Sequence, residues 1–110
     1  MITVTIFKDR ENHFRGFHCS GHAGYSESGQ DIVCSAASVL IINTVNALQM
    51  YTPDKDFSIK TSEAEGIIDV NFPHLLSETG DVLVKAMVLG LESIQDEYND
   101  QYIHVIFKEV

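Results

Sequence analysis

The chain has 110 residues, of which 45% are hydrophobic and 21% charged, and it contains only two cysteines. This composition is that of a globular protein rather than a disordered one, and the length suits one domain, so we predict a single domain over residues 1–110. The formal net charge of -9 argues against nucleic acid as a partner, because a phosphate backbone requires Lys and Arg. A basic or neutral polypeptide fits this charge better.

The sequence also predicts where the protein works. We expect no apolar run to approach the roughly 18 to 20 residues needed to cross a bilayer, so no membrane partner is predicted. The first six residues lack the basic segment and the cleavage site of a signal peptide, which indicates a cytoplasmic protein. In a reducing cytosol both cysteines should be free thiols.

The first half of the chain is predicted to form a hairpin, a loop and a helix. Residues 2–8 alternate apolar and polar side chains, as in a strand with one face in a core, and 13–21 is the hairpin partner. Residues 24–30 contain two glycines and no apolar periodicity, which predicts a loop. Asp31 is expected to cap a helix over 32–50, which the Thr52-Pro53-Asp54 segment ends.

The second half is predicted to add two short strands, a helix and a last strand. The strands are expected around residues 57–60 and 68–72. A helix capped by Ser77 or Thr79 should run to about residue 98, with Gly90 allowing close packing on the first helix. With a final strand at 102–107, the order is β-β-α-β-β-α-β. The expected fold is an α+β two-layer sandwich, with a mainly antiparallel sheet carrying both helices on one face.

A histidine and a cysteine stand at the two ends of the predicted loop. The two segments read Gly21-His22-Ala23 and Asp31-Ile32-Val33-Cys34-Ser35-Ala36-Ala37-Ser38. If Asp31 is the cap, Cys34 occupies the third helical position, where free N–H groups and the helix dipole favour an anionic sulfur and could hold an oxyanion. The alternative is a buried structural cysteine.

The neighbours of Cys34 each have two possible roles. His22 could be the base that activates the thiol, or a polar surface residue. Asp31 could cap the helix or orient the imidazole, and Ser38, one turn after Cys34, could bond near the sulfur or simply pack. Tyr25 could face a substrate or be an ordinary exposed residue.

A zinc site is the competing interpretation. His18, Cys19, His22 and Cys34 are all possible zinc ligands. In an extended strand, however, His18 and His22 would lie roughly 13 Å apart, and Cys19 would point to the opposite face. We therefore predict no metal and no other cofactor.

At these residues the chain resembles the bacterial ribosomal-processing cysteine protease family Prp. The matching pattern is Gly21-His22-Ala23, a short loop, and then Gly29-Gln30-Asp31-Ile32-Val33-Cys34-Ser35-Ala36-Ala37-Ser38. Length and element order agree with the family over essentially the whole chain. The resemblance implies a single cysteine protease domain with Cys34 as nucleophile, His22 as general base and acid, and Asp31 and Ser38 in support.

The resemblance also implies a substrate and an assembly. The family removes an N-terminal, Phe-rich extension from ribosomal protein twenty-seven of the large subunit. A homodimer is implied, as is a loop that closes over the substrate and contains Gly24, Tyr25 and Gly29. The alternative function is a noncatalytic ribosome-assembly or peptide-binding module that holds the same extension, for example by strand addition.

Overall fold

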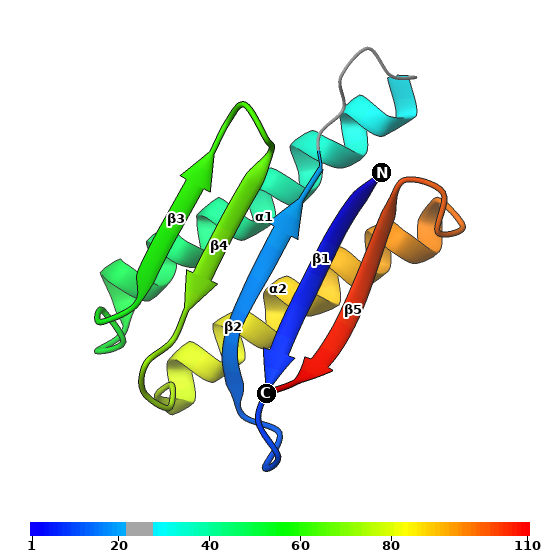
Figure 1. The fold of residues 1–110 in the computed structure, drawn as a ribbon. Helices are drawn as coiled ribbons and strands as arrows, with labels where there is room; N and C mark the ends of the chain where they lie inside the picture. The colour runs from blue at the N-terminus through cyan, green and yellow to red at the C-terminus, as the bar shows by residue number, and fades with distance from the viewer. Residues whose placement is uncertain (22–27) are drawn as a thin grey trace.

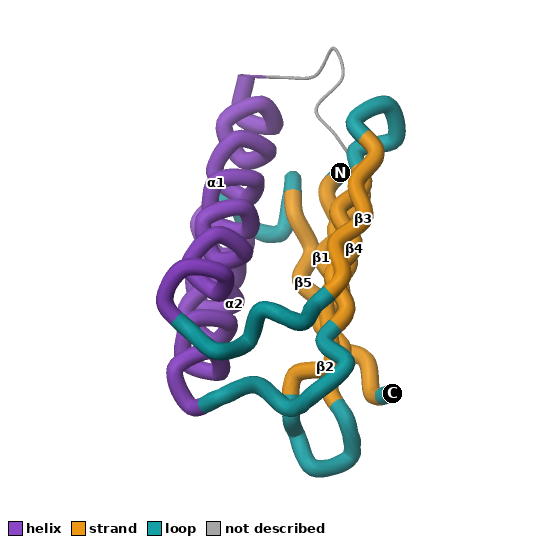
Figure 2. The backbone as a smooth tube through the Cα atoms, turned by 90° about the vertical axis from the view of Figure 1, so that its left-hand side faces the viewer, coloured by secondary structure: helices purple, strands orange, loops and turns teal. Residues whose placement is uncertain are grey.

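The computed structural model describes residues 1–21 and 28–110, and the side chains of 1–21 and 32–110. Its elements follow the predicted order (Figure 1): β1 (Ile2–Lys8), β2 (Phe14–Ser20), α1 (Ser28–Tyr51), β3 (Ser58–Ser62), β4 (Ile67–Asn71), α2 (Glu78–Glu97) and β5 (Ile103–Glu109). Both helices lie on one face of the sheet (Figure 2), which confirms the predicted two-layer α+β architecture.

The five strands form one mixed sheet in the order β3-β4-β2-β1-β5. β1 pairs with β2, β2 with β4 and β4 with β3 in antiparallel fashion, whereas β5 runs parallel to β1. The sheet is therefore mainly antiparallel, as predicted, with β3 and β5 at its two edges.

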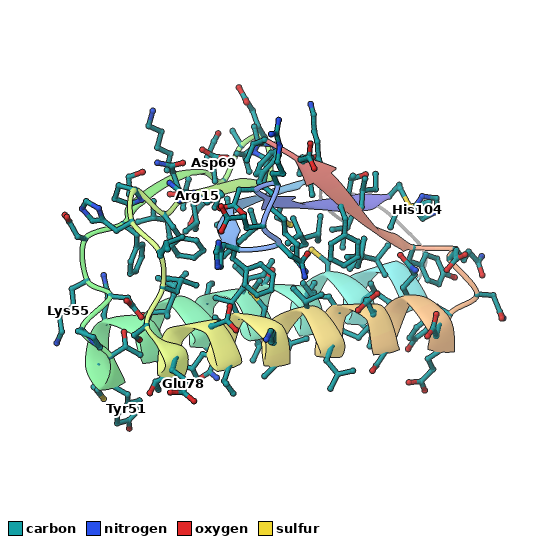
Figure 3. All side chains as sticks on the ribbon, turned by 90° about the horizontal axis from the view of Figure 1, so that it is seen from below. Arg15, Tyr51, Lys55, Asp69, Glu78 and His104 are labelled. Carbon is teal, nitrogen blue, oxygen red and sulfur yellow. The ribbon has the colours of Figure 1, made fainter. Side chains whose placement is uncertain are left out.

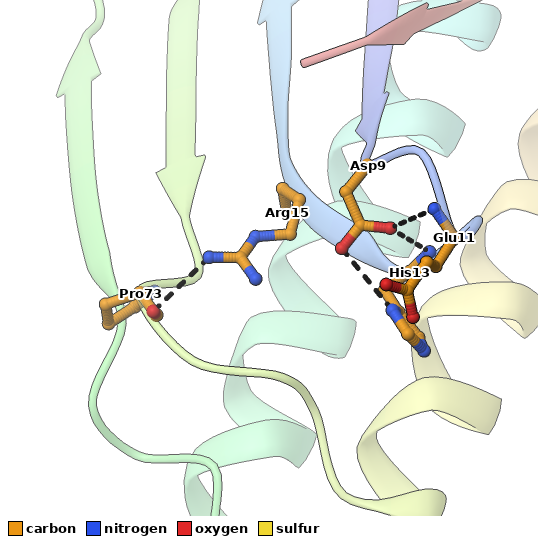
Figure 4. A network of polar contacts seen from close by, with 5 residues as sticks. All are labelled: Asp9, Glu11, His13, Arg15 and Pro73. Atoms are coloured by element: carbon orange, nitrogen blue, oxygen red, sulfur yellow. Dashed lines mark hydrogen bonds and ion pairs between the residues drawn. The ribbon is translucent and has the colours of Figure 1, made fainter.

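The β1–β2 turn is built on one carboxylate (Figure 4). Asp9 Oδ1 accepts the backbone N–H groups of Glu11 at 2.9 Å and His13 at 3.0 Å, and its second oxygen lies 3.4 Å from His13 Nδ1. The bond from the His13 N–H is the main reason that the pKa of Asp9 is lowered. Arg15 then ties β2 to the segment after β4 by donating to the Pro73 carbonyl at 3.3 Å.

The core lies between the sheet and the helices. From β1 the alternate residues Ile2, Val4 and Ile6 are buried, as the strand prediction requires. α1 contributes residues that recur every three or four positions, which are Val33, Ala37, Ile41, Val45 and Leu48. The far face of the sheet is open, and Figure 3 shows Asp69 on that side, whereas Tyr51 and Glu78 lie on the outer side of the helices.

The apolar length of α1 corrects one prediction. Residues Ile32–Tyr51 have a mean hydropathy of 1.6, so by length and composition alone this stretch could cross a membrane. In this fold one face of the stretch packs in the core, and core helices commonly share such composition. Gly90 allows the expected close packing of the helices, because a Cβ atom there would lie 2.9 Å from Leu40 Cδ1.

The start of α1 corrects a second prediction. The helix begins at Ser28, so Ser28, Gly29 and Gln30 are helical rather than part of a loop, and Asp31 is the fourth helical residue rather than the cap. A glycine costs a helix only about 1 kcal/mol, and adding turns to an existing helix is far easier than starting one. Because the residues from Val33 onward are packed in a stable helix, further helical turns form on its N-terminal side and include Gly29.

Candidate active site

The early turns of α1 border a cavity of about 350 Å³. α1 contributes four residues to its wall, which are Cys34, Ala37, Ser38 and Ile42. Cys34 is half-buried and packs against the core, with its side chain at the cavity. A volume of this size is in the range of small-molecule sites and holds an amino-acid side chain.

The opposite wall comes from the β3–β4 hairpin. Six of its residues line the cavity, namely Thr61, Ser62, Glu63, Gly66, Ile67 and Ile68. Sequence reasoning missed this wall, because nothing local in the hairpin marks it as part of a site. Only the pairing of β4 with β2 brings the hairpin beside α1.

The floor and the rim come from the first two strands, through Ile2, Cys19 and Gly21. Cys19 is only 7% exposed. Gly21 has a φ of 99°, and a Cβ atom there would collide with the Met1 carbonyl oxygen. Only glycine suits this left-handed conformation against a neighbouring backbone, so Gly21 fixes the direction in which the chain leaves β2.

The two cysteines of the cavity differ chemically. The pKa of Cys19 is raised to about 11, mainly by burial and to a lesser extent by the negative charge that Cys34 carries when ionised. Cys19 is therefore a neutral thiol near pH 7. Cys34 is the more accessible sulfur and the better placed to meet a reagent that enters the cavity.

The predicted site residues Cys34 and Ser38 on α1 share the expected face but lie further from the helix start than predicted. Cys34 and Ser38 lie together on the cavity side of α1, as one helical turn of spacing predicts. Cys34 is the seventh residue counted from Ser28, not the third as predicted, so its own N–H is beyond the four unpaired groups at the helix start. The argument for an oxyanion site built on those groups at Cys34 is therefore wrong.

His22, Gly24 and Tyr25 lie outside the described residues. Gly29 belongs to α1 rather than to the loop in which it was predicted, and Asp31 is described only in its backbone. Among the predicted site residues whose side chains the structure describes, Cys34 and Ser38 are brought together at the cavity.

The alternative metal ligands are separated by the sheet. Cys19 lies on the inner face of β2, whereas His18 lies on the open face, where its Nδ1 is 3.0 Å from Asp69 Oδ1. The predicted alternation along this strand is confirmed. Within residues 1–21 and the chain from 28 onward, no three His, Cys, Asp or Glu residues gather in a way that could hold a metal ion.

A smaller cavity of about 90 Å³ lies among Pro53, Phe57, Phe72 and Leu76. No cysteine lines it, and its ionisable groups are two aspartates and His74. The larger cavity is therefore the candidate active site. A half-buried thiol at a cavity in a small α+β fold fits a protein of the cysteine-hydrolase class.

Comparison with known proteins specifies this class. The family model described as "Cysteine protease Prp" matches residues 1–104, and the chain belongs to this family of cysteine proteases. The ribosomal processing cysteine protease Prp of Bacillus subtilis is 28% identical over 104 residues, covering 91% of this chain and 92% of the relative.

Solved structures agree with this assignment. The essential ribosomal processing protease Prp from S. aureus, in complex with a substrate peptide, superposes with a TM-score of 0.90 at 28% identity, covering 98% of this chain and 100% of that one. The same protease with a covalently linked product peptide gives a TM-score of 0.87 at 29% identity, with the same coverage. The predicted family, the fold and the cysteine protease activity are thereby confirmed.

Proposed function

We propose that this enzyme removes the N-terminal extension of ribosomal protein twenty-seven of the large subunit, with Cys34 as the nucleophile. The observation that carries the proposal is the half-buried thiol of Cys34 at the 350 Å³ cavity, in a chain whose relatives are named ribosomal processing proteases. The net charge of -9 supports a basic substrate, since opposite charge speeds encounter.

The proposed reaction divides hydrolysis into two steps. His22 takes the proton of the Cys34 thiol, and the Cys34 sulfur attacks the scissile carbonyl carbon. The C–N bond then breaks and the amine leaves with that proton, returned by His22, which produces a thioester on Cys34. His22 then takes a proton from water, the resulting hydroxide attacks the thioester, and the carboxylic acid and the thiol are released. The support for His22 is its place in the family's Gly-His-Ala pattern.

The surrounding residues have supporting roles in this proposal. Ser38 contacts the reacting groups from one turn beyond Cys34, since both line the cavity. Asp31 supports the site from the preceding turn, and Gly24 and Tyr25 contact the substrate. These assignments rest on the family pattern, apart from the position of Ser38.

We further propose that the enzyme acts in the cytoplasm as a homodimer. Apolar side chains on the two helices are well exposed in a single chain, with Val39 at 66% and Leu89 at 67%, and they would be covered in an assembly. Analytical ultracentrifugation at several protein concentrations tests the dimer. A mass that stays at 12.3 kDa contradicts it.

Mass spectrometry of the extended ribosomal protein tests the activity. The substrate is incubated with the native enzyme, with the Cys34→Ala variant and with the His22→Ala variant. One discrete cut after the Phe-rich segment, absent with Cys34→Ala and much slower with His22→Ala, is the expected result. An intact substrate that co-purifies with both the native chain and Cys34→Ala would instead indicate the noncatalytic binding module.

A further inference from the structure

The cavity contains two sulfur atoms from different layers of the protein. Cys34 reaches it from α1, and Cys19 reaches it from the sheet. These are the only cysteines of the chain, and both are free. The reaction proposed above uses Cys34 and leaves Cys19 without a chemical role.

The strand pairing directs Cys19 toward the helices. Cys19 pairs with Val4 on one side and with Ile68 on the other, and Val4 is a core residue of the inner face. Cys34 packs against the same core cluster from the helix layer. The two thiols therefore face one cavity from opposite sides.

We propose that Cys19 and Cys34 form an oxidative modification site, in which a peroxide oxidises Cys34 and Cys19 then closes an intramolecular disulfide that reversibly blocks the enzyme. The consequence for activity rests on the proposed function, because it requires Cys34 to be the nucleophile. The sulfur chemistry itself does not depend on that function.

The two steps balance with one equivalent of peroxide. The Cys34 thiolate attacks the O–O bond of hydrogen peroxide, which forms an S–O bond and releases hydroxide, leaving a sulfenic acid. The Cys19 sulfur then attacks the Cys34 sulfur, the S–O bond breaks, and water leaves with the thiol proton. Two electrons have passed from the two thiols to the peroxide. A dithiol reductant reverses the outcome.

The difference in exposure sets the order of these events. Cys34 is half-buried at the cavity and meets the peroxide first, whereas Cys19 is 7% exposed and remains a neutral thiol near pH 7. A sulfenic acid without a nearby thiol proceeds to the irreversible sulfinic acid when peroxide is in excess. Cys19 therefore protects Cys34 from permanent damage.

The disulfide has a geometric requirement. It needs the Cα atoms of Cys19 and Cys34 within about 7 Å, so it forms in conformations that bring the second turn of α1 that close to β2. The cavity of about 350 Å³ provides space for that movement. The disulfide would then occupy the space that a substrate needs and would consume the nucleophile.

The experiment treats dilute native enzyme with hydrogen peroxide and measures free thiols, intact mass and peptide-cleaving activity. We expect both thiols to disappear, the mass to fall by two hydrogen atoms, and the tryptic peptides of Cys19 and Cys34 to be joined. A dithiol reductant should restore the mass and the activity of the untreated enzyme.

The Cys19→Ser and Cys19→Ala variants provide the matched comparison, and each is normalised to its own untreated activity. After peroxide treatment, the mass of both variants should rise by two oxygen atoms, as sulfinic acid forms on Cys34. The fraction of activity that the reductant restores should be at least about tenfold smaller than in the native enzyme. Two variants are used because one of them could pack poorly. Cys34→Ser should keep its remaining thiol under the same treatment.

Two results would overturn the proposal. One is a native enzyme that forms sulfinic acid as fast as the Cys19 variants do. The other is a disulfide that joins two chains, seen as a doubled mass on a non-reducing gel. A Cys34→Ser variant that still cleaves would contradict the proposed function instead, and it would leave the disulfide result unaffected.

Discussion

The starts of the two helices lie at opposite ends of the helix layer and are built in opposite ways (Figure 1). At the start of α2, Asp54 accepts the Ser77 N–H at 2.9 Å and the Ser77 hydroxyl at 2.6 Å. The Ser77 oxygen in turn accepts the Gly80 N–H at 3.1 Å. The early turns of α1 instead border the cavity of about 350 Å³ that holds Cys34.

This contrast separates stability from chemistry. Satisfied hydrogen bonds at a helix start stabilise the folded state, and such groups have little capacity left for a ligand. A reactive thiol needs open space beside it, and that space contributes no packing. We therefore expect changes near Ser77 to lower stability and leave activity per folded molecule intact. Changes at Cys34 should lower activity and leave stability intact.

The largest expected effect is on activity, at Cys34. Cys34→Ser replaces the sulfur by a poorer nucleophile of similar size and should reduce peptide cleavage by about 1,000-fold or more. Its urea midpoint should stay close to that of the native enzyme. A rate within about tenfold of native would mean that another group carries the reaction.

The largest expected effect on stability is at Asp54. Asp54→Ala removes the acceptor of both Ser77 bonds and should lower the free energy of unfolding by about 2 kcal/mol, measured by urea denaturation. Asp56→Ala is the matched control, because the side chain of Asp56 is 84% exposed and pairs with the exposed His74. An equal loss of unfolding free energy in the two variants would show that the bonds from Ser77 to Asp54 contribute little to stability.

The stability of the protein at alkaline pH should depend on Cys19, which lies at the floor of the cavity. The pKa of Cys19 rises from 9.0 to about 11 on folding, so the unfolded chain ionises first as pH increases. The neutral Cys19 thiol therefore adds on the order of 2 kcal/mol to the free energy of unfolding below pH 9. This contribution is lost as the pH rises from 9 to about 11. Urea unfolding at pH 8 and pH 11 should therefore show a smaller alkaline loss for Cys19→Ser than for the native chain.

The smallest expected effect compares two glycines of α2. A Cβ atom at Gly80 would collide with the Asp54 carboxylate, which two Ser77 bonds hold in place. Gly80→Ala should therefore destabilise the protein by about 1 kcal/mol, although alanine favours helix. At Gly90 the neighbour is the flexible end of Leu40, so Gly90→Ala should be near neutral. Thermal unfolding of both variants measures the difference.

Local patterns predicted most of the secondary structure. The alternation of Ile2, Val4 and Ile6 identified β1, and the proline after Thr52 marked the end of α1. Ser77, one of the two predicted caps, is the N-cap of α2. These signals succeed because each depends on neighbouring residues and on the backbone alone.

Predictions at the site were only partly successful. Cys34 and Ser38 share a face because one helical turn separates them, and this needs no tertiary information. The start of α1 was misplaced at Asp31, because the two glycines of residues 24–30 indicated a loop and the packing of the later turns could not be known. The position of Cys19 in the cavity wall was not predicted for a similar reason, since it depends on how the helix layer packs on the sheet.

The sequence by itself determined the order of elements, the α+β class, the family pattern around Cys34 and the assignment of inner and outer faces along β1 and at Cys19 in β2. These follow from periodicity and from local backbone preferences. Only the tertiary structure decided that the β3–β4 hairpin forms the second wall of the cavity and that Cys19 faces the same space as Cys34. Cys34 lies 15 positions from Cys19 and 34 from Ile68, and strand pairing and helix packing bring all three to one cavity. No local signal encodes such contacts.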